Sequence, residues 1–389
     1  MPTRKGLRLK TSTNPNVTYH QSDGVGAILP LHFQSMPLRP IYGHDPIRSR
    51  LGRAILSHTL PQTMLLVGRR GVGKQRLALW IAQALLCERR GDQGAPCGTC
   101  SACAKVTTLA HPDLHWFVPV EVTKKGADAD KQVDLVEEAL WEEMAARRAE
   151  LWQAPAGMAS HSIASVRLLA RSLQLTPAMG RYKVFIVGDA ERLTPQKGNP
   201  EAANALLKAL EEPPQDAFIL LTSSDPDSLL PTILSRMVRV SVSRLPDSVM
   251  TEFAQLELET KDARRVESLV RSADGSIGRM VELANGGSTV ADGNAVSLET
   301  LLERGGSPVE RYARALAQTP FQARGGFTGL LDGLLVQLRA RARRGGDTQA
   351  VVAAIAQVLE TRELAQGNVN PQLLTALLGD ELESGRGGS

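Results

Sequence analysis

The chain has 389 residues, of which 42% are hydrophobic and 22% charged, and 45 Lys and Arg against 41 Asp and Glu give a formal net charge of +4. This length predicts two or three domains with sizeable cores, and the composition excludes a chain that is disordered throughout. No apolar run reaches the roughly 18 residues of a membrane span, and no apolar segment follows the basic N-terminus, so we expect a cytoplasmic protein without a membrane partner.

The first part of the chain changes from irregular to regular sequence. Residues 1–36 show no hydrophobic period, which predicts a mobile N-terminal tail. Apolar residues at a spacing of four predict a helix around 47–55. The short apolar run 64–67 is closed by a glycine and is typical of a buried parallel strand, and residues 74–86 are strongly helical in composition.

A charged segment separates this region from the next apolar runs. Residues 121–150 are rich in Lys, Asp, Glu and Ala, and we expect 133–152 to form a solvated surface helix. A further helix is predicted at 166–175, and Pro177 stops it. The segment has no role that the sequence reveals.

Three more apolar runs, at 182–187, 217–222 and 238–242, predict strands. A helix at 202–210 lies between two of them and ends before two prolines. Strands that alternate with helices predict an α/β domain with a parallel sheet covered by helices on both faces.

Strand patterns cease at about residue 245. We expect an α/β domain at 37–245, a small helical domain at 246–288 that ends in an Asn-Gly-Gly-Ser linker, and an all-helical C-terminal domain at 289–389.

A glycine-rich string follows the first predicted strand and opens the next helix. It reads Gly-Arg-Arg-Gly-Val-Gly-Lys-Gln and matches the G-x-x-x-x-G-K phosphate-binding pattern through Gly68, Gly73 and Lys74, with Gly71 as a further glycine. Glycines let backbone N–H groups surround phosphate oxygens, while the helix N-terminus and the lysine add positive potential. Gln75 stands where a Ser or Thr hydroxyl normally binds Mg²⁺. We therefore predict a nucleotide loop that holds its metal poorly.

The carboxylates of such a site are expected after the second core strand. Phosphoryl transfer needs an Asp there to hold Mg²⁺ and a nearby residue to orient the attacking water. The strand ends in Gly188-Asp189-Ala190-Glu191. In the preferred alignment Gly188 takes the metal position and no carboxylate is available; shifted by one residue, Asp189 is the metal ligand. A structural role at the edge of the sheet is an equal alternative for Asp189 and Glu191.

All four cysteines lie close together, at Cys87, Cys97, Cys100 and Cys103, among glycines and a proline that bend the chain. A disulfide framework would scatter cysteines along the chain. Four thiolates form the closed tetrahedron that structural Zn²⁺ prefers. Reduced free thiols are the alternative, and a redox pair would not need four cysteines. The cluster predicts a structural zinc module at 87–103.

Taken together, these features resemble the AAA+ clamp-loader subunits of bacterial DNA polymerase III. The string Asn-Ala-Leu-Leu-Lys-Ala-Leu-Glu-Glu-Pro-Pro at 204–214 is close to that family's most recognisable sequence. Thr222 falls at the position of the family's first sensor. Ser235 and Arg236 resemble the Ser-Arg motif whose arginine reaches the ATP of an adjacent subunit, and the cysteine spacing is that of the family's zinc module.

Departures from the motifs separate two subunit types within that family. The gamma/tau ATPase type keeps Thr after the loop lysine and an Asp-Glu pair after the second strand; here these positions hold Gln75 and Gly188-Asp189. The second-sensor arginine is displaced by one residue, to Arg279. The sequence is therefore more similar to the delta-prime type, and it leaves open whether ATP and Mg²⁺ bind at all.

The resemblance implies a stator within a ring of gamma/tau and delta subunits. Arg236, oriented by Ser235, would act in trans on a neighbour's ATP, and the assembly would place the sliding clamp on primed DNA during replication, as part of the DNA polymerase holoenzyme. Residues 246–288 would be the lid domain and 289–389 the collar. Two alternatives are an active gamma/tau-like ATPase and a zinc-dependent DNA-binding module.

Overall fold

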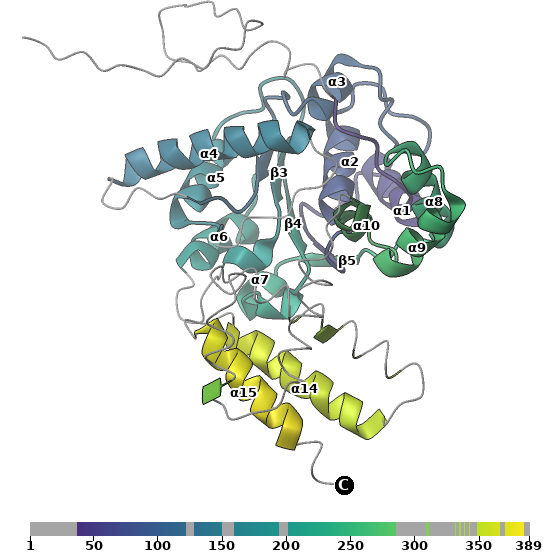
Figure 1. Cartoon of the computed structure of the whole chain (residues 1–389). Coiled ribbons are helices and arrows are strands. Elements are labelled where there is room, and N and C mark those ends of the chain that lie inside the picture. Colours follow the sequence, from purple (N-terminus) through teal and green to yellow (C-terminus); the bar gives the residue numbers. More distant parts are fainter. Residues whose placement is uncertain are drawn as a thin grey trace, which may run out of the picture.

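The computed structural model describes residues 37–121, 128–149, 159–193, 201–284, 348–365 and 370–384, with isolated positions between 309 and 342. The predicted N-terminal tail, the linker and most of the residues between 285 and 347 lie outside the described part. Figure 1 shows an α/β body, a group of small helices beside it and a pair of longer helices near the C-terminus.

The body is built on a parallel sheet, as predicted. Five strands lie in the order β2-β3-β4-β1-β5, and every neighbouring pair is parallel. The strands are β1 (Thr63–Val67), β2 (Leu114–Phe117), β3 (Lys183–Val187), β4 (Ala217–Ser223) and β5 (Val238–Ser241). Because β1, β3 and β4 are central, their runs of apolar residues are buried on both faces.

Helices cover both faces of the sheet (Figure 1), each with its own hydrophobic cluster. One face packs against α1 (Asp45–Leu56), α2 (Lys74–Leu86) and α3 (Ser101–Thr107). The other packs against α4 (Ala129–Ala149), α5 (Ile163–Gln174), α6 (Glu201–Glu211) and α7 (Pro231–Leu234). The expected three-layer arrangement of the sheet is confirmed.

Two elements differ from the sequence prediction. Strand β2 is not predicted from the sequence, because His115 interrupts the apolar residues of this four-residue strand. In the structure the His115 ring stacks on Phe185, with ring centroids 4.7 Å apart. Helix α4 begins before residue 133 and is not simply solvated. Its Val133, Val136 and Leu140 are buried in the same cluster as α5 and α6.

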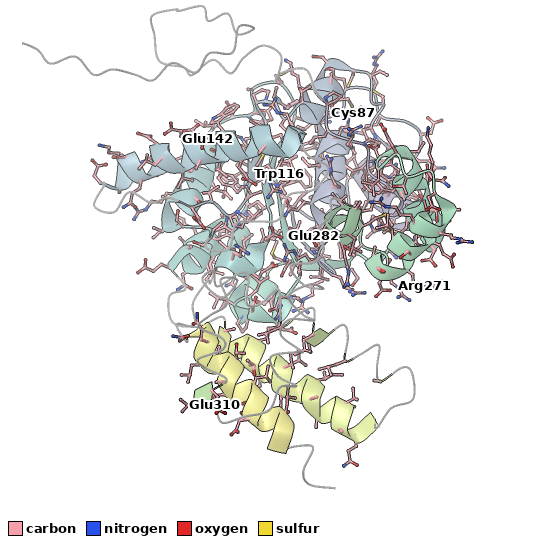
Figure 2. All side chains as sticks on the ribbon, viewed as in Figure 1. Cys87, Trp116, Glu142, Arg271, Glu282 and Glu310 are labelled. Carbon is pink, nitrogen blue, oxygen red and sulfur yellow. The ribbon has the colours of Figure 1, made fainter. Side chains whose placement is uncertain are left out.

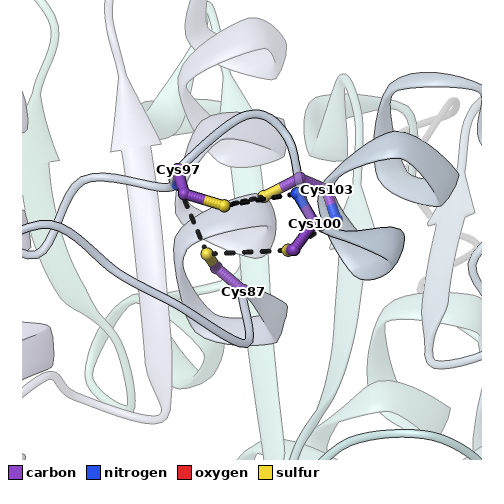
Figure 3. Close-up of side chains that lie close together, drawn as sticks. All are labelled: Cys87, Cys97, Cys100 and Cys103. Atoms are coloured by element: carbon purple, nitrogen blue, oxygen red, sulfur yellow. Dashed lines mark hydrogen bonds between the residues drawn. The ribbon is translucent and has the colours of Figure 1, made fainter.

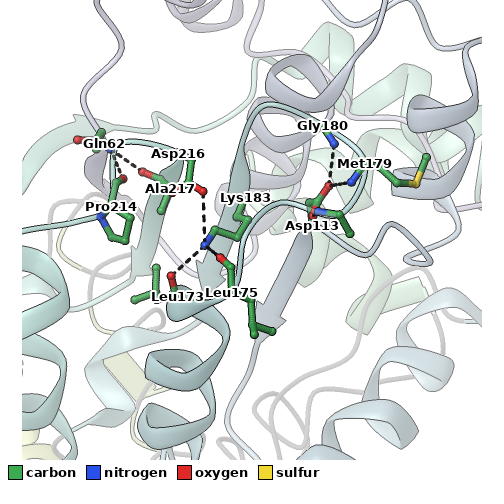
Figure 4. Close-up of polar contacts among 11 residues, drawn as sticks. Gln62, Asp113, Leu173, Leu175, Met179, Gly180, Lys183, Pro214, Asp216 and Ala217 are labelled. Atoms are coloured by element: carbon green, nitrogen blue, oxygen red, sulfur yellow. Dashed lines mark hydrogen bonds and ion pairs between the residues drawn. The ribbon is translucent and has the colours of Figure 1, made fainter.

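Polar side chains fix the start of β3 (Figure 4). Asp113 is buried, and its carboxylate accepts hydrogen bonds from the backbone N–H groups of residues 178, 179 and 180. Lys183 is also buried and donates to the carbonyls of Leu173 and Leu175 at the end of α5. These contacts close the turn between α5 and β3, so the strand emerges in a fixed register.

After the sheet the described chain is helical. The helices α8 (Asp247–Leu256), α9 (Ala263–Ala273) and α10 (Ile277–Ala284) share a small core around Met250 and Met280. Helices α14 (Thr348–Ala365) and α15 (Pro371–Ser384) pack against each other around Val358 and Leu378 (Figure 1).

Candidate functional site

The glycine-rich loop follows β1 and leads directly into α2, as the motif predicts. Gly71 and Gly73 have φ values of 76° and 101°, in the left-handed region where glycine carries no steric cost. A Cβ atom at Gly68 would lie 2.3 Å from the carbonyl oxygen of Val242. These glycines therefore set the course of the loop backbone.

Lys74 lies inside this loop and is buried. Its Nζ donates hydrogen bonds of 2.8 Å to the carbonyls of Gly68 and Arg69 and to Oγ of Ser224. Burial lowers the pKa of Lys74 to about 8, although the carboxylates of Glu191 and Asp189 act in the opposite direction. The buried ammonium is bonded to uncharged oxygens, so it is ready to exchange them for an anion.

The metal side of the loop is filled by the Gln75 side chain. Its Nε2 donates to Oδ2 of Asp189 at 3.1 Å, and its Oε1 accepts from Nη1 of Arg147 at 3.2 Å. A Cβ atom at Gly188 would lie 2.8 Å from Cδ and Nε2 of Gln75. A carboxylate side chain at position 188 would therefore collide with Gln75. Of the two alignments predicted above, the one that places Asp189 at the metal position is the one that brings a carboxylate to Gln75.

The predicted residues at the ends of β3 and β4 lie together. The backbone N–H of Asp189 donates to Oγ1 of the buried Thr222 at 3.1 Å, and the Glu191 carboxylate accepts from the backbone N–H of Ser224. Burial raises the pKa of Glu191, and the neighbouring Asp189 charge raises it further. The Glu191 carboxylate is thus held by a backbone group, whereas the Asp189 carboxylate is held by the Gln75 side chain.

The N-terminal end of α10 rests on the loop. Ser276 Oγ donates to the carbonyl of Arg70 at 3.0 Å, and the backbone N–H of Gly278 donates to the carbonyl of Gly71 at 3.0 Å. Arg279 follows immediately, so the structure brings this predicted second-sensor residue to the same end of α10. Two body-side arginines, Arg69 and Arg244, both pair with Asp274 just before α10.

Arg236 and Ser235 lie elsewhere. The backbone carbonyl of Arg236 accepts from Oγ1 of Thr63, the first residue of β1, whereas the phosphate loop follows the last residue of β1. The Arg236 guanidinium donates to Oε1 of Glu211 at 2.6 Å, to the carbonyl of Thr232 at 2.8 Å and to Oγ of Ser235 at 3.4 Å. Arg236 is therefore paired with a surface carboxylate at the edge of the sheet opposite the loop.

The four cysteines converge on one point between α2 and α3 (Figure 3). Their four sulfur atoms all lie within 4.8 Å of one another, with 3.9 Å between Cys87 and Cys100 and 4.0 Å between Cys97 and Cys103. Four sulfurs bound tetrahedrally to Zn²⁺ at ~2.3 Å would be about 3.8 Å apart. The four residues are close enough to share one metal ion.

Backbone N–H groups donate hydrogen bonds to three of the four sulfur atoms. The backbone N–H groups of Cys97, Cys100 and Cys103 donate to the sulfurs of Cys87, Cys97 and Cys100 respectively, at 3.3 to 3.4 Å. Hydrogen bonds from the backbone of Thr99 and of Cys100 lower the pKa of the Cys97 thiol to about 6. Thiolates stabilised in this way are the form that binds metal.

Comparison with known proteins places this geometry in a family. A family model described as DNA polymerase III, delta subunit, matches residues 43–246, which is more than half of the chain. The chain belongs to this family. Among the described residues, no helix has both the length and the apolar character that crossing a membrane requires.

Individual relatives within DNA polymerase III are similar at moderate identity. The tau subunit of Escherichia coli is 25% identical over 346 residues, which cover 88% of this chain and 45% of that protein. The delta' subunit of Pseudomonas aeruginosa is 32% identical over 225 residues, covering 58% and 55%. The delta' subunit of Bacillus subtilis is 27% identical over 235 residues, covering 60% and 57%. The chain spans about half the length of these relatives.

In this member of the DNA polymerase III delta subunit family, three side chains at the loop were not found by sequence reasoning. His44 Nε2 contacts the carbonyl of Val72 at 2.8 Å, Arg147 contacts Gln75, and the Trp116 ring lies against the Arg147 guanidinium. Figure 2 labels Trp116, which lies below α4 in this view. None belongs to a contiguous motif. The only local signal is at His44, which directly precedes the Asp-Pro start of α1.

Proposed function

We propose that this chain is a clamp-loader subunit of the delta-prime type. It acts as a stator in a ring with gamma/tau and delta subunits and completes the ATP site of a neighbouring ATPase subunit with Arg236. The ring loads the sliding clamp on primed DNA, and contact with DNA is made through phosphates and not through base sequence.

The position of Arg236 carries this proposal. Arg236 lies beside the first residue of β1, and the phosphate loop begins after the last. The five residues of β1 span about 13 Å at ~3.3 Å per residue, so Arg236 cannot reach its own loop. The Arg236 side chain is one-third exposed and is held by the surface carboxylate of Glu211. A phosphate of ATP bound to an adjoining subunit would replace Glu211 as its partner.

The state of the chain's own loop supports a stator. Mg²⁺ in such loops is held by a hydroxyl and an aspartate. Here the Gln75 amide fills the space in front of Gly188, and Asp189 is already bonded to it. Without these ligands the chain binds its own metal poorly, and hydrolysis is left to its neighbours.

The remaining regions take the roles that the family resemblance suggests. Residues 37–245 carry the AAA+ domain, 246–288 the lid and 289–389 the collar that joins the subunits. The four cysteines bind a structural Zn²⁺, because a closed four-sulfur shell leaves no position for a reacting water. The support for zinc is the spacing of the sulfur atoms and the backbone N–H groups aimed at them.

The test is the DNA-stimulated ATPase of a complex reconstituted from this chain with gamma/tau and delta subunits. An arginine finger contributes roughly 10³–10⁵ to the rate at the site that it serves. Arg236→Ala should therefore silence the adjacent site and lower the rate of the complex by that site's share. The variant should still assemble into the complex, as measured by gel filtration.

Arg271→Ala is the matched control. Arg271 forms an exposed pair with Glu267 at 2.6 Å, the same distance as Arg236 to Glu211, so both variants lose a comparable surface ion pair. Arg236→Lys keeps the charge but not the planar fork and should restore little activity. An ATPase rate unchanged by Arg236→Ala would refute the finger.

An active gamma/tau-like ATPase is the second candidate. Two observations favour it: the match to the E. coli tau subunit covers 88% of this chain, and Lys74, Asp189 and Glu191 meet at one site. Magnesium-dependent turnover by the isolated chain that is abolished by Lys74→Ala would establish it and displace the stator.

A further inference from the structure

Helix α4 is anchored so that its C-terminal end meets α2. Val133, Val136 and Leu140 are buried in the core that α4 shares with α5 and α6. These residues recur at a helical spacing of three to four and turn one face of α4 towards the body. The last turns of α4 are thereby carried to the metal side of the phosphate loop, where Arg147 contacts Gln75.

The Arg147 guanidinium is held in one place by three contacts. Its Nε donates to Oε1 of Glu143 at 2.9 Å, its Nη1 donates to Oε1 of Gln75 at 3.2 Å, and its Cζ lies 5.2 Å from the centroid of the Trp116 ring. Only 11% of its side chain is exposed. A buried and stacked guanidinium is a fixed positive charge.

The residues around Gln75 differ from those of a Mg²⁺ site at each position. The amide of Gln75 replaces the hydroxyl that would bind Mg²⁺, and Gly188 provides no carboxylate. Asp189 is bonded to the same amide at 3.1 Å, on the other side from Arg147. The Arg147 guanidinium places a positive charge next to Gln75 at this end of the loop.

The loop itself keeps the donors of an anion site. In the described structure, the backbone N–H groups of Gly71, Gly73, Lys74 and Gln75 donate to no backbone carbonyl. Gly71 and Gly73 have left-handed backbone angles, and Lys74 and Gln75 form the first turn of α2, where N–H groups have no partner inside the helix. Their natural acceptors are phosphate oxygens.

Two side-chain donors next to the loop also have no acceptor. Within the described residues, Nη2 of Arg147 and Nε1 of Trp116 are buried and make no hydrogen bond. Buried donors are almost always paired in folded proteins. These two belong to side chains in contact with each other, and Arg147 also contacts Gln75 at the start of α2, so unpaired side-chain donors accompany the unpaired N–H groups of the loop.

We propose that α4 supplies this phosphate loop with its cation, and that the loop binds the phosphate chain of a nucleoside diphosphate or triphosphate without a divalent metal. Arg147 neutralises the charge that Mg²⁺ would otherwise neutralise, and Lys74 contributes from inside the loop. The bound nucleotide is not hydrolysed, because no metal ion is held next to it. It is a static ligand that braces the loop against α10.

Calorimetric titration of the isolated full-length chain with ADP, ATP and inorganic pyrophosphate tests this proposal, in buffer prepared without Mg²⁺ and in excess MgCl₂; no chelator is added, so the proposed Zn²⁺ stays in place. We expect equal affinity in the two buffers, within about twofold. Arg147→Met should weaken binding without Mg²⁺ at least about tenfold, since it removes a charge-assisted contact to phosphate. Pyrophosphate binding would assign the affinity to the phosphate chain alone, whereas binding of ADP and ATP only would add the nucleoside to the site; both results support the proposal.

Arg148→Met is the matched control, because Arg148 is the next residue on α4 and its Nη1 donates instead to the carbonyl of Thr108 at 3.1 Å. It should bind like the unaltered chain. Glu143→Gln keeps the guanidinium and removes its carboxylate partner, so it should tighten binding and remains informative if Arg147→Met does not fold. Binding that requires Mg²⁺, no binding of any probe, or equal binding by Arg147→Met and the unaltered chain would overturn the proposal. The assay does not involve Arg236, so its failure leaves the finger untouched.

Discussion

Replacing the buried Lys74 with methionine should change how the stability of the protein depends on pH. Methionine has a similar length and no charge. The ordinary lysine pKa of 10.5 falls to about 8 in the folded chain, because burial disfavours the ammonium form. At about 1.36 kcal/mol per pKa unit, the folded state at neutral pH carries a penalty of about 3 kcal/mol for this charge.

The direction in which the free energy of unfolding changes with pH follows from proton binding. Below about pH 8 the lysine is protonated in both states, and the penalty is complete. Between about pH 8 and pH 10.5 the unfolded chain holds the proton and the folded chain does not, so the free energy of unfolding rises with pH. Relative to Lys74→Met, the unaltered chain should gain about 2 to 3 kcal/mol between pH 7 and pH 10. The hydrogen bonds lost in the variant are independent of pH to first order and cancel in this comparison.

Urea unfolding followed by circular dichroism measures the difference at each pH. Lys261→Met removes an exposed lysine and serves as the control, and its profile should run parallel to that of the unaltered chain. Parallel profiles for Lys74→Met and the unaltered chain would refute the reasoning, because they would mean that the folded state bears no cost for this buried charge.

The remaining predictions concern the cysteine cluster and the turn before β3. Cys103→Ala should abolish the bound Zn²⁺ measured by elemental analysis and make residues 87–103 sensitive to protease, since such sites supply on the order of 10 kcal/mol of folding energy; unchanged zinc content would contradict the four-sulfur site. Asp113→Asn should destabilise the fold by about 2 to 4 kcal/mol at neutral pH. The amide would place its own N–H donors against the backbone N–H groups that now donate hydrogen bonds to the carboxylate. Burial raises the pKa of Asp113, but those N–H groups outweigh it and hold the pKa below its usual value. The contribution of the carboxylate is therefore complete above about pH 4 and is lost as pH falls through the lowered pKa, so urea midpoints of the two proteins should converge in acid.

The contiguous features were predictable because their chemistry is local. The glycine pattern around Lys74 requires a particular backbone course, and the spacing of the four cysteines places their sulfurs within reach of one ion. The central strands were also predictable, since strands buried on both faces are apolar along their whole length.

Edge and half-buried elements were harder to predict. Strand β2 is short and contains His115 and Trp116, which pack through their rings and so do not give an apolar signal. The charged residues of α4 conceal the three apolar residues that anchor it, because a single narrow stripe is enough to bury a helix against a core.

The sequence by itself determined that the chain has a G-x-x-x-x-G-K pattern, that Gln75 and not a hydroxyl residue follows its lysine, and that all four cysteines lie within one short segment. Only the tertiary structure decided which side chains surround Gln75. Gln75 and Arg147 are 72 residues apart and meet because the packing of α4 carries one to the other. The sheet likewise decided that Arg236 lies at the edge opposite its own loop. Such contacts depend on which elements are neighbours in space, and no local pattern encodes that.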